Sequence, residues 1–181
     1  MRIISGEAKG RTLFAPQGRE TRPTSDKIRG SMFNIIGSEV IGARVIDLFG
    51  GTGALALEAL SRGAAFAVIS DSSRQAIQAI ERNARNVLKD EYEHRVRIVK
   101  LDYRAAIEQA GDGFDMVFLD PPYRMTEVYA DALSRLAGRL NPGCLVVMER
   151  QKDVSIQLPE GFSACDTRLY GDTAVDFARF R

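Results

Sequence analysis

The chain of 181 residues carries 25 lysines and arginines against 24 aspartates and glutamates, and 45% of its residues are hydrophobic. This length suffices for one domain with a sizeable core and leaves no room for a second full domain. Because the charges nearly balance, the chain is neither a polycation nor an acidic tail protein. Its apolar runs fall well short of the ~20 residues of a membrane span, so we expect a soluble, cytoplasmic protein.

Basic side chains are concentrated at the amino terminus. Residues 1–30 hold seven basic and three acidic groups, a net charge of +4, which leaves about −3 for the rest of the chain. Two short apolar runs at 2–5 and 11–15, separated by glycines, predict a β-hairpin. A helix with its N-cap within 24–26 and a stop at Gly37 follows. A basic arm of this kind suits contact with a phosphate backbone, although an ordinary solvated face has the same composition.

From residue 43 onward, short β-branched runs alternate with helical stretches. The strand-like runs are 43–49, 65–71, 95–102, 114–120 and 144–150, and the helical stretches are 54–63, 73–88, 105–110 and 128–140. This alternation predicts an α/β fold with a parallel sheet, helices around it and right-handed connections. The last segment has two strand-like runs around Gly171 and Asp172, which predict a closing hairpin.

Cysteine and histidine usage indicates a reducing compartment and chemistry without a metal. Cys144 and Cys165 are far apart in the sequence, and we expect both to pack within strands. His94 is the single histidine, and no cluster of ligand residues has the spacing of a zinc or iron site.

In parallel sheets, ligands bind beyond the carboxyl ends of the strands. The first predicted strand ends in DLFGGTG, from Asp47 to Gly53, which opens directly into a helix. Glycines let the backbone turn sharply and approach a ligand, and the helix N-terminus offers unpaired N–H groups. Gly51, Gly53 and Ala56 also satisfy the dinucleotide pattern G-x-G-x-x-A, so the motif alone leaves the cofactor ambiguous. A tight turn without a ligand is a further alternative.

Two more carboxylates follow the next two strands. Asp71 ends the second strand, where a carboxylate can accept hydrogen bonds from both hydroxyls of a ribose, as in NAD and S-adenosylmethionine sites. Asp102 ends the third strand and could accept from an adenine amine, although a helix N-cap is an equally good interpretation. These residues indicate an adenosine-containing cofactor and little more.

The fourth strand ends in Asp120-Pro121-Pro122-Tyr123. Two prolines remove backbone donors and hold the chain extended, which leaves carbonyl oxygens and the Asp120 carboxylate as acceptors. An exocyclic amine is a poor nucleophile because its lone pair is delocalised into the ring. Two acceptors on its N–H groups would favour the localised lone pair that attacks a sulfonium methyl. Tyr123 offers a face on which a base can stack, and Asp120 can assist proton loss; a plain turn is the alternative.

DLFGGTGALALEALSRG together with DPPY resembles the amino-methyltransferase class of Rossmann-like methyltransferases. RIISGEAKGR, TRPTSDKIRGSMFNIIG and the spacing of these motifs resemble, over nearly the whole chain, the RsmD family of bacterial 16S ribosomal RNA guanine-N2 methyltransferases. The resemblance implies a mostly parallel seven-stranded sheet with helices on both faces, one reversed strand in the final hairpin, and an N-terminal β-hairpin extension. The family usually has alanine where this chain has Gly50 and serine where it has Thr52.

The resemblance also implies S-adenosylmethionine as the cofactor and assigns roles to residues. Candidate cofactor-binding residues are Asp47, Phe49, Gly51, Gly53, Asp71, Asp102 and Tyr103. The segment from Asp47 to Gly53, here called the glycine loop, would hold the methionine part. Asp71 would hold the ribose and Asp102 the adenine. Candidate catalytic residues are Asp120, Pro121 and Tyr123, of which the aspartate and the tyrosine would grip the guanine.

We expect residues 1–40 to be a basic RNA-binding extension and residues 41–181 to be the methyltransferase domain. Candidate RNA contacts are Lys9, Arg11, Arg22 and Thr24, the last two lying over the active site. Core packing of the hairpin is the alternative. The expected partner is 16S ribosomal RNA in the assembling small subunit, with no membrane and no metal, and with a monomeric enzyme because the sequence shows no heptad or dedicated interface segment.

Two other classes of function remain open. An NAD-dependent oxidoreductase would explain the glycine pattern and leave the Asp-Pro-Pro-Tyr motif without a task. A non-catalytic, cofactor-binding ribosome assembly factor would use the same fold without turnover. DNA and protein-glutamine methyltransferases share the Asp/Asn-Pro-Pro-aromatic motif, but such DNA enzymes usually carry a target-recognition domain that this chain has no room for.

Overall fold

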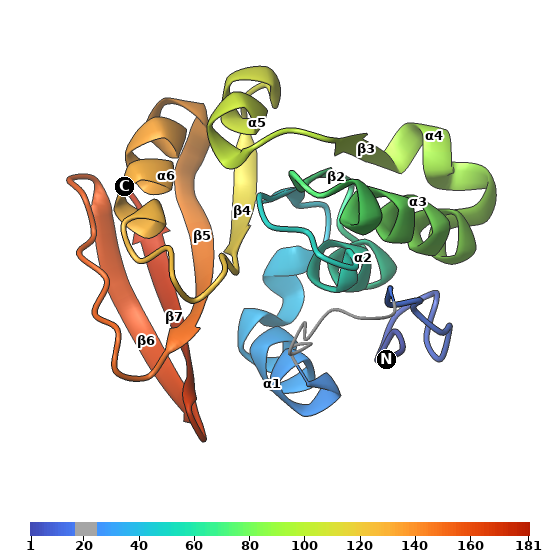
Figure 1. Ribbon diagram of the computed structural model, residues 1–181, viewed down its shortest axis with the longest axis horizontal. Helices are drawn as coiled ribbons and strands as arrows, with labels where there is room; N and C mark the ends of the chain where they lie inside the picture. Colours follow the sequence, from blue (N-terminus) through green and yellow to red (C-terminus); the bar gives the residue numbers. More distant parts are fainter. Residues whose placement is uncertain (17–24) are drawn as a thin grey trace.

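The computed structural model describes residues 1–16 and 25–181, which form one mixed sheet covered by helices (Figure 1). Within these residues the sheet has seven strands in the order β3-β2-β1-β4-β5-β7-β6, and β7 runs antiparallel to both of its neighbours. The strands are β1 (Arg44–Asp47), β2 (Phe66–Ser70), β3 (Val96–Val99), β4 (Phe114–Leu119), β5 (Leu140–Gln151), β6 (Phe162–Tyr170) and β7 (Thr173–Phe180). The predicted α/β fold, including its closing hairpin with one reversed strand, is confirmed.

Helices cover both faces of the sheet. Side chains of α1, α2 and α3 belong to one apolar cluster, and those of α5 and α6 to a second cluster on the other face. The helices are α1 (Asp26–Ile36), α2 (Ala54–Ser61), α3 (Arg74–Leu88), α4 (Tyr92–Arg95), α5 (Tyr103–Gln109) and α6 (Val128–Leu136), with 3₁₀ turns at Gly37–Val40, Lys89–Glu91 and Ala137–Arg139. None of the helices in the described ranges is long and apolar enough to cross a membrane.

The central strand β1 is buried from both sides. Val45 belongs to the first apolar cluster and Ile46 to the second, and neither has any exposed surface. A strand covered on both faces needs a continuous apolar run rather than an alternating pattern, which is what its sequence provides.

The register of the strands places the candidate carboxylates along one edge of the sheet. Asp47, the last residue of β1, pairs with Ile69 of β2 on one side and with Phe118 of β4 on the other. Asp71 and Asp120 each follow two residues after these partners, so they flank Asp47 on both sides.

The N-terminal segment, residues 1–16, lies beside α2 and α3 (Figure 1). The chain reverses direction as predicted, but it pairs in an isolated antiparallel bridge between Arg2 and Thr12 rather than in two strands. The reason is that helix α2 takes the backbone donors of this segment. Ile4 and Ser5 donate their N–H groups to the carboxylate of Glu58 at 2.9 and 3.0 Å.

Close packing against α2 requires a glycine at one point of the segment. Gly6 has φ +87°, and a Cβ at this position would lie 1.8 Å from the carbonyl oxygen of Ser61. The hydroxyl of Ser61 accepts from the N–H of Ala8 at 2.9 Å and donates to the carbonyl of Ser5 at 2.7 Å. Residues 1–16 therefore share one apolar cluster with α1, α2 and α3, to which Ile3, Ala8 and Leu13 contribute.

A buried ion pair joins α1, α2 and the N-terminal segment. The side chains of Arg29 and Glu58 have no exposed surface, and their nearest charged atoms are 3.7 Å apart. Arg29 also donates to the carbonyl of Arg2 and to Asp26, and Glu58 accepts from Arg62 at 2.8 Å. Burial lowers the pKa of the Arg29 guanidinium, and the charges of Glu58 and Asp26 oppose that shift.

The two cysteines differ in their surroundings. Cys144 is buried in β5, as expected, and burial raises its pKa to about 12. Cys165 is exposed, so the expectation that it packs within a strand was wrong. The reason is that β6 is the last strand of the sheet and most of its residues are exposed on both faces, which the sequence pattern does not reveal.

Removing the charge of Glu58 should destabilise the protein strongly. We expect Glu58→Gln to lower the free energy of unfolding by about 3 to 5 kcal/mol, because the buried Arg29 guanidinium loses its counter-charge. Chemical denaturation measures this loss.

The control is Glu93→Gln, which removes an exposed ion pair with Arg85 at 4.0 Å and should change stability by less than about 1 kcal/mol. Equal effects of the two substitutions would contradict the structural role of the buried pair.

Candidate active site

The carboxylate of Asp47 lies at the end of β1 with 1% of its surface exposed. Its Oδ1 accepts from the N–H of Phe49 at 3.4 Å. No lysine or arginine among the described residues lies within ion-pair distance of it. Burial raises its pKa to about 7, the negative charge of Asp71 adds to the rise, and backbone hydrogen bonds from Phe49 and Ala56 oppose it. A buried carboxylate without a cation is suited to a positively charged ligand group.

The glycine loop is fastened to the end of β2. The N–H of Gly51 donates to Oδ2 of Asp71 at 3.0 Å, and the N–H of Ser73 donates to Oδ1 at 2.8 Å. Gly51 and Gly53 have φ of +57° and +81°, a conformation that favours glycine. An ionised carboxylate has about four acceptor positions, so Asp71 can hold the loop and still accept from a ribose.

Gly50 packs so closely that an alanine at this position would disturb its neighbours. A Cβ here would lie 2.5 Å from a methyl of Ile69 and 2.9 Å from a methyl of Ile80. The N–H of Gly50 donates to the carbonyl of Ser70 at 2.8 Å, which holds the loop against β2. In this chain, the glycine allows that contact with two full isoleucines in place.

Asp102 is the N-cap of α5. Its Oδ1 accepts from the N–H groups of Arg104 and Ala105 at 2.9 and 3.2 Å. The capping interpretation of this residue is therefore correct, and the adenine contact stays a prediction.

Tyr103 and Phe49 pack against each other beside this cap, with ring centroids 5.7 Å apart. The hydroxyl of Tyr103 donates to Asp131 at 2.6 Å, and Arg104 pairs with the same carboxylate at 2.9 Å. These contacts lower the pKa of Asp131 to about 2. The two rings form an aromatic wall between the ends of β1 and β3.

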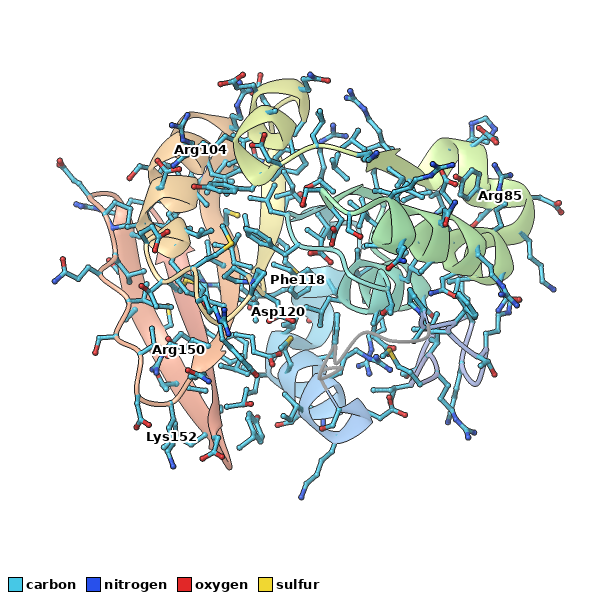
Figure 2. All side chains as sticks on the ribbon, viewed as in Figure 1. Arg85, Arg104, Phe118, Asp120, Arg150 and Lys152 are labelled. Carbon is cyan, nitrogen blue, oxygen red and sulfur yellow. The ribbon has the colours of Figure 1, made fainter. Side chains whose placement is uncertain are left out.

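Asp120 directly follows β4 and is half-buried, and Figure 2 places it just beyond Phe118. Pro121 is buried, Pro122 is exposed and Tyr123 is half-buried in a turn. The N–H of Met125 donates to the carbonyl of Pro122 at 2.9 Å, which closes this turn.

The structure describes two of the four candidate RNA contacts, Lys9 and Arg11. Lys9 is exposed in the turn of the N-terminal segment. The guanidinium of Arg11 donates to the carbonyls of Asn86 and Val87 at the end of α3, so it has a structural role there. Arg22 and Thr24 lie outside the described residues.

The family described as Conserved hypothetical protein 95 matches residues 1–179. The chain belongs to this family. It is 39% identical to "Putative rRNA methyltransferase YlbH" of Bacillus subtilis over 166 residues, which cover 88% of this chain and 86% of that one. It is 36% identical to "Ribosomal RNA small subunit methyltransferase D" of Escherichia coli (strain K12) over 124 residues, which cover 68% of this chain and 61% of that one. The resemblance to the RsmD family is thereby confirmed.

Solved structures agree with this membership. "Putative methyltransferase yhhF from Escherichia coli" superposes with a TM-score of 0.85 at 27% identity, covering 99% of this chain and 97% of that one. A hypothetical protein from Thermus thermophilus gives a TM-score of 0.76 at 29% identity and covers 98% of both chains. The Rossmann-like methyltransferase fold is confirmed.

A buried amide, which no sequence motif marked, connects the N-terminal segment with the glycine loop. Asn83 of α3 is 1% exposed. Its Oδ1 accepts from the N–H of Phe14 at 2.7 Å, and its Nδ2 donates to the carbonyls of Phe14 and Thr52, both at 2.9 Å. The signal was an amide on the apolar face of an amphipathic helix, between Ile80 and Val87.

Tyr129 of α6 was missed as well. It is 3% exposed, and its hydroxyl donates to the carbonyl of Glu149. Burial raises its pKa, and the negative charge of Asp120 raises it further. The phenol thus stays neutral and lies within electrostatic reach of the candidate catalytic carboxylate. Within the described ranges, no group of three or more potential metal ligands occurs, and metal-free chemistry stays a prediction.

The raised pKa of Asp47 predicts a pH-dependent stability. The folded protein binds this proton more tightly than the unfolded chain does, so stability is lost as the pH rises from the ordinary value of 3.8 to about 7. We expect Asp47→Asn to be more stable than the wild type at pH 8, with a free energy of unfolding higher by on the order of a few kcal/mol, because it removes the buried charge. Its unfolding temperature should rise accordingly.

At pH 5, which lies inside this range, the difference should fall to less than half of its value at pH 8. Thermal unfolding of the cofactor-free protein at both pH values measures this. Asp112→Asn is the control, since the side chain of Asp112 is 74% exposed. A stability difference between Asp47→Asn and the wild type that is the same at pH 5 and pH 8 would contradict the raised pKa.

Proposed function

We propose that this protein transfers a methyl group from S-adenosylmethionine to the exocyclic N2 amine of a guanine in 16S ribosomal RNA of the small subunit. The observation that carries the proposal is the placement of Asp120-Pro121-Pro122-Tyr123 at the end of β4, next to β1 with its buried Asp47 and its glycine loop. The curated relatives support ribosomal RNA as the substrate class, because the names of the Bacillus and Escherichia proteins contain that activity.

The cofactor is S-adenosylmethionine. The fold is shared with methyltransferases, one of which, SMU.776, was solved in complex with SAH. The site of this chain fits such a ligand. Asp47 offers a buried negative charge for the ammonium of the methionine part, and the glycine loop brings the backbone close. Asp71 has acceptor positions left for the ribose, and the aromatic wall of Phe49 and Tyr103 flanks the adenine side.

When bound, the cofactor supplies an electrophilic methyl group on a positively charged sulfur. The residues after β4 make the amine reactive. The carbonyl of Pro122 already accepts from Met125, so we assign the carboxylate of Asp120 and the carbonyl of Pro121 as acceptors for the two N–H groups. Both acceptors gain strength as positive charge develops on the nitrogen, which stabilises the transition state more than the bound substrate.

The reaction balances without a metal or a redox partner. A nitrogen–carbon bond forms while the carbon–sulfur bond breaks, and the sulfur leaves as a neutral thioether. The nitrogen then loses one proton, for which Asp120 is the nearest assigned acceptor. Tyr123 stacks on the guanine, which must leave its helix to reach this edge of the sheet.

The RNA-contacting surface includes the N-terminal segment. Lys9 is exposed at its turn, and Arg11 holds the segment to α3. We therefore assign Lys9 to a phosphate contact and Arg11 to positioning of the segment, and we propose Arg22 and Thr24 as further RNA contacts. We propose that the enzyme acts as a monomer on RNA of the assembling small subunit.

Loss of the Asp120 carboxylate should reduce turnover more than binding. We expect Asp120→Ala to lower kcat by about 100- to 1000-fold, as for the loss of one transition-state acceptor, while the Kd for S-adenosylmethionine stays within about twofold. Asp120→Asn should recover part of the rate because its amide oxygen still accepts. Methyl transfer to small ribosomal subunits and calorimetric cofactor binding measure these effects.

Asp112→Ala is the matched control, since this exposed carboxylate stands before β4, at the opposite end of the strand. Unchanged turnover in Asp120→Ala would remove the proposed chemistry. A wild type that binds cofactor and RNA without any turnover would instead favour an assembly factor, and binding of a nicotinamide cofactor would favour an oxidoreductase.

Neutralising Lys9 should weaken RNA binding through electrostatics alone. A plot of log K for RNA binding against log salt concentration has a negative slope. We expect Lys9→Gln to make this slope less steep by about 0.7 to 0.9, the value of one lost phosphate contact. Arg139 directly precedes β5, at the opposite ends of the strands from the candidate active site. Arg139→Gln should therefore leave the slope unchanged. Equal slopes for wild type and Lys9→Gln would leave the segment with a packing role only.

A further inference from the structure

An open groove of about 620 Å³ lies between the N-terminal segment and the exposed face of α3, apart from the candidate active site. Its walls are Phe14, Pro16, Gln75, Gln78 and Arg82. The two glutamines and the arginine lie at positions i, i+3 and i+7 of α3, so they share one face of the helix. None of these residues has a task in the proposed reaction.

Phe14 is 40% exposed, which is unusual for a large aromatic side chain whose backbone is fixed. Asn83 holds the N–H and the carbonyl of this residue from the buried side. The carbon at the centre of the Arg82 guanidinium lies 4.1 Å from the ring centroid of Phe14. The ring is therefore held at the surface by a buried anchor, with a planar cation stacked on it.

The chemistry of the groove matches an unpaired nucleobase. Aromatic rings and arginine guanidinium planes stack on bases, and each base has a face for such stacking. The side-chain amides of Gln75 and Gln78 are exposed and carry both donors and acceptors, as the edges of bases do. The volume of the groove lies within the range of small-molecule binding sites.

The charge of the surface around the groove favours a polyanion. Helix α3 carries three arginines and one glutamate, all of them exposed: Arg74, Arg82, Arg85 and Glu81. Lys9 adds another exposed cation on the N-terminal segment. A protein partner with an acidic surface would meet the same cations, but it would give the exposed ring and the amides no specific task.

A hydrogen bond also connects the groove to the glycine loop. The amide of Asn83 that holds Phe14 donates to the carbonyl of Thr52, which stands between Gly51 and Gly53. A base bound at Phe14 would therefore rest on the same rigid unit as the glycine loop.

We propose that the groove between Phe14 and α3 binds an unpaired base of the substrate RNA outside the target guanine, by stacking on Phe14 and Arg82. This inference rests on the proposed function for the identity of the RNA and names a second contact point on it. Stacking supplies affinity, so the site should act on RNA binding and leave the chemical step unchanged.

The chain contains no tryptophan, so Phe14→Trp introduces a single fluorescent reporter into the groove. We expect titration with short single-stranded RNA oligonucleotides to quench this fluorescence, because a stacked base lies in contact with the indole. Ile41→Trp is the matched control. Ile41 is 68% exposed, lies just before β1 and does not line the groove, so a tryptophan there should not respond. Absence of quenching in Phe14→Trp while RNA binds would overturn the proposal.

Kinetics of methyl transfer to small subunits provide the second measurement. Phe14→Leu keeps an apolar side chain and removes the ring, and we expect it to raise the KM for the RNA substrate at least about fivefold with kcat unchanged. Phe14→Tyr should restore the wild-type KM. An unchanged KM in Phe14→Leu, with thermal stability and cofactor affinity preserved, would overturn the assignment of the groove as a base-binding site. It would not affect the proposed function.

The two proposals fail in different ways. Quenching of Phe14→Trp by RNA in a protein that transfers no methyl group would support the groove and overturn the proposed function. Quenching by ribosomal proteins of the subunit and not by free RNA would overturn the assignment of a base as the occupant.

Discussion

The geometry of the site depends on one buried charge, the carboxylate of Asp47 at the end of the central strand. Burial raises its pKa to about 7, so the empty protein bears a cost for keeping it ionised. A cationic ligand group removes that cost, and the neighbouring strands determine what else the ligand can touch. Asp71 and Asp120 follow β2 and β4 at equal distances along the chain from the partners of Asp47. In the proposed reaction, Asp71 binds the sugar of the cofactor and Asp120 the amine to be methylated.

Buried polar side chains, rather than strand pairing, hold the N-terminal segment to this core. Glu58 binds two of its N–H groups, Ser61 a third, and Asn83 both backbone groups of Phe14. Each of these side chains would be costly to bury without its partner, so the segment and the helices stabilise one another. Because Asn83 also binds the carbonyl of Thr52, the surface proposed for RNA and the loop proposed for the cofactor share a common support.

Sequence reasoning predicted the order of strands and helices because hydrophobic periodicity in a parallel sheet is local. It also placed the acidic residues at strand ends, and the register then brought Asp47, Asp71 and Asp120 to one edge. It did not predict the partners of polar residues, which depend on contacts distant in sequence. Arg11 was predicted to contact phosphate and instead donates to carbonyls at the end of α3, and no sequence motif marked Glu58, which is fully buried. Cys165 is exposed because β6 is the last strand of the sheet, a position that depends on the whole topology and not on the local sequence pattern.

The identity of the methylated nucleoside is the most direct test of the proposed reaction. Small ribosomal subunits from a strain without this protein would be incubated with the protein and tritiated S-adenosylmethionine, and the RNA would then be digested to nucleosides. We expect label in N2-methylguanosine, with an initial rate about 100- to 1000-fold lower when Asp120→Ala replaces the wild type. Label in a different base would contradict the guanine-N2 assignment, and the absence of label despite cofactor binding would contradict the catalytic role itself.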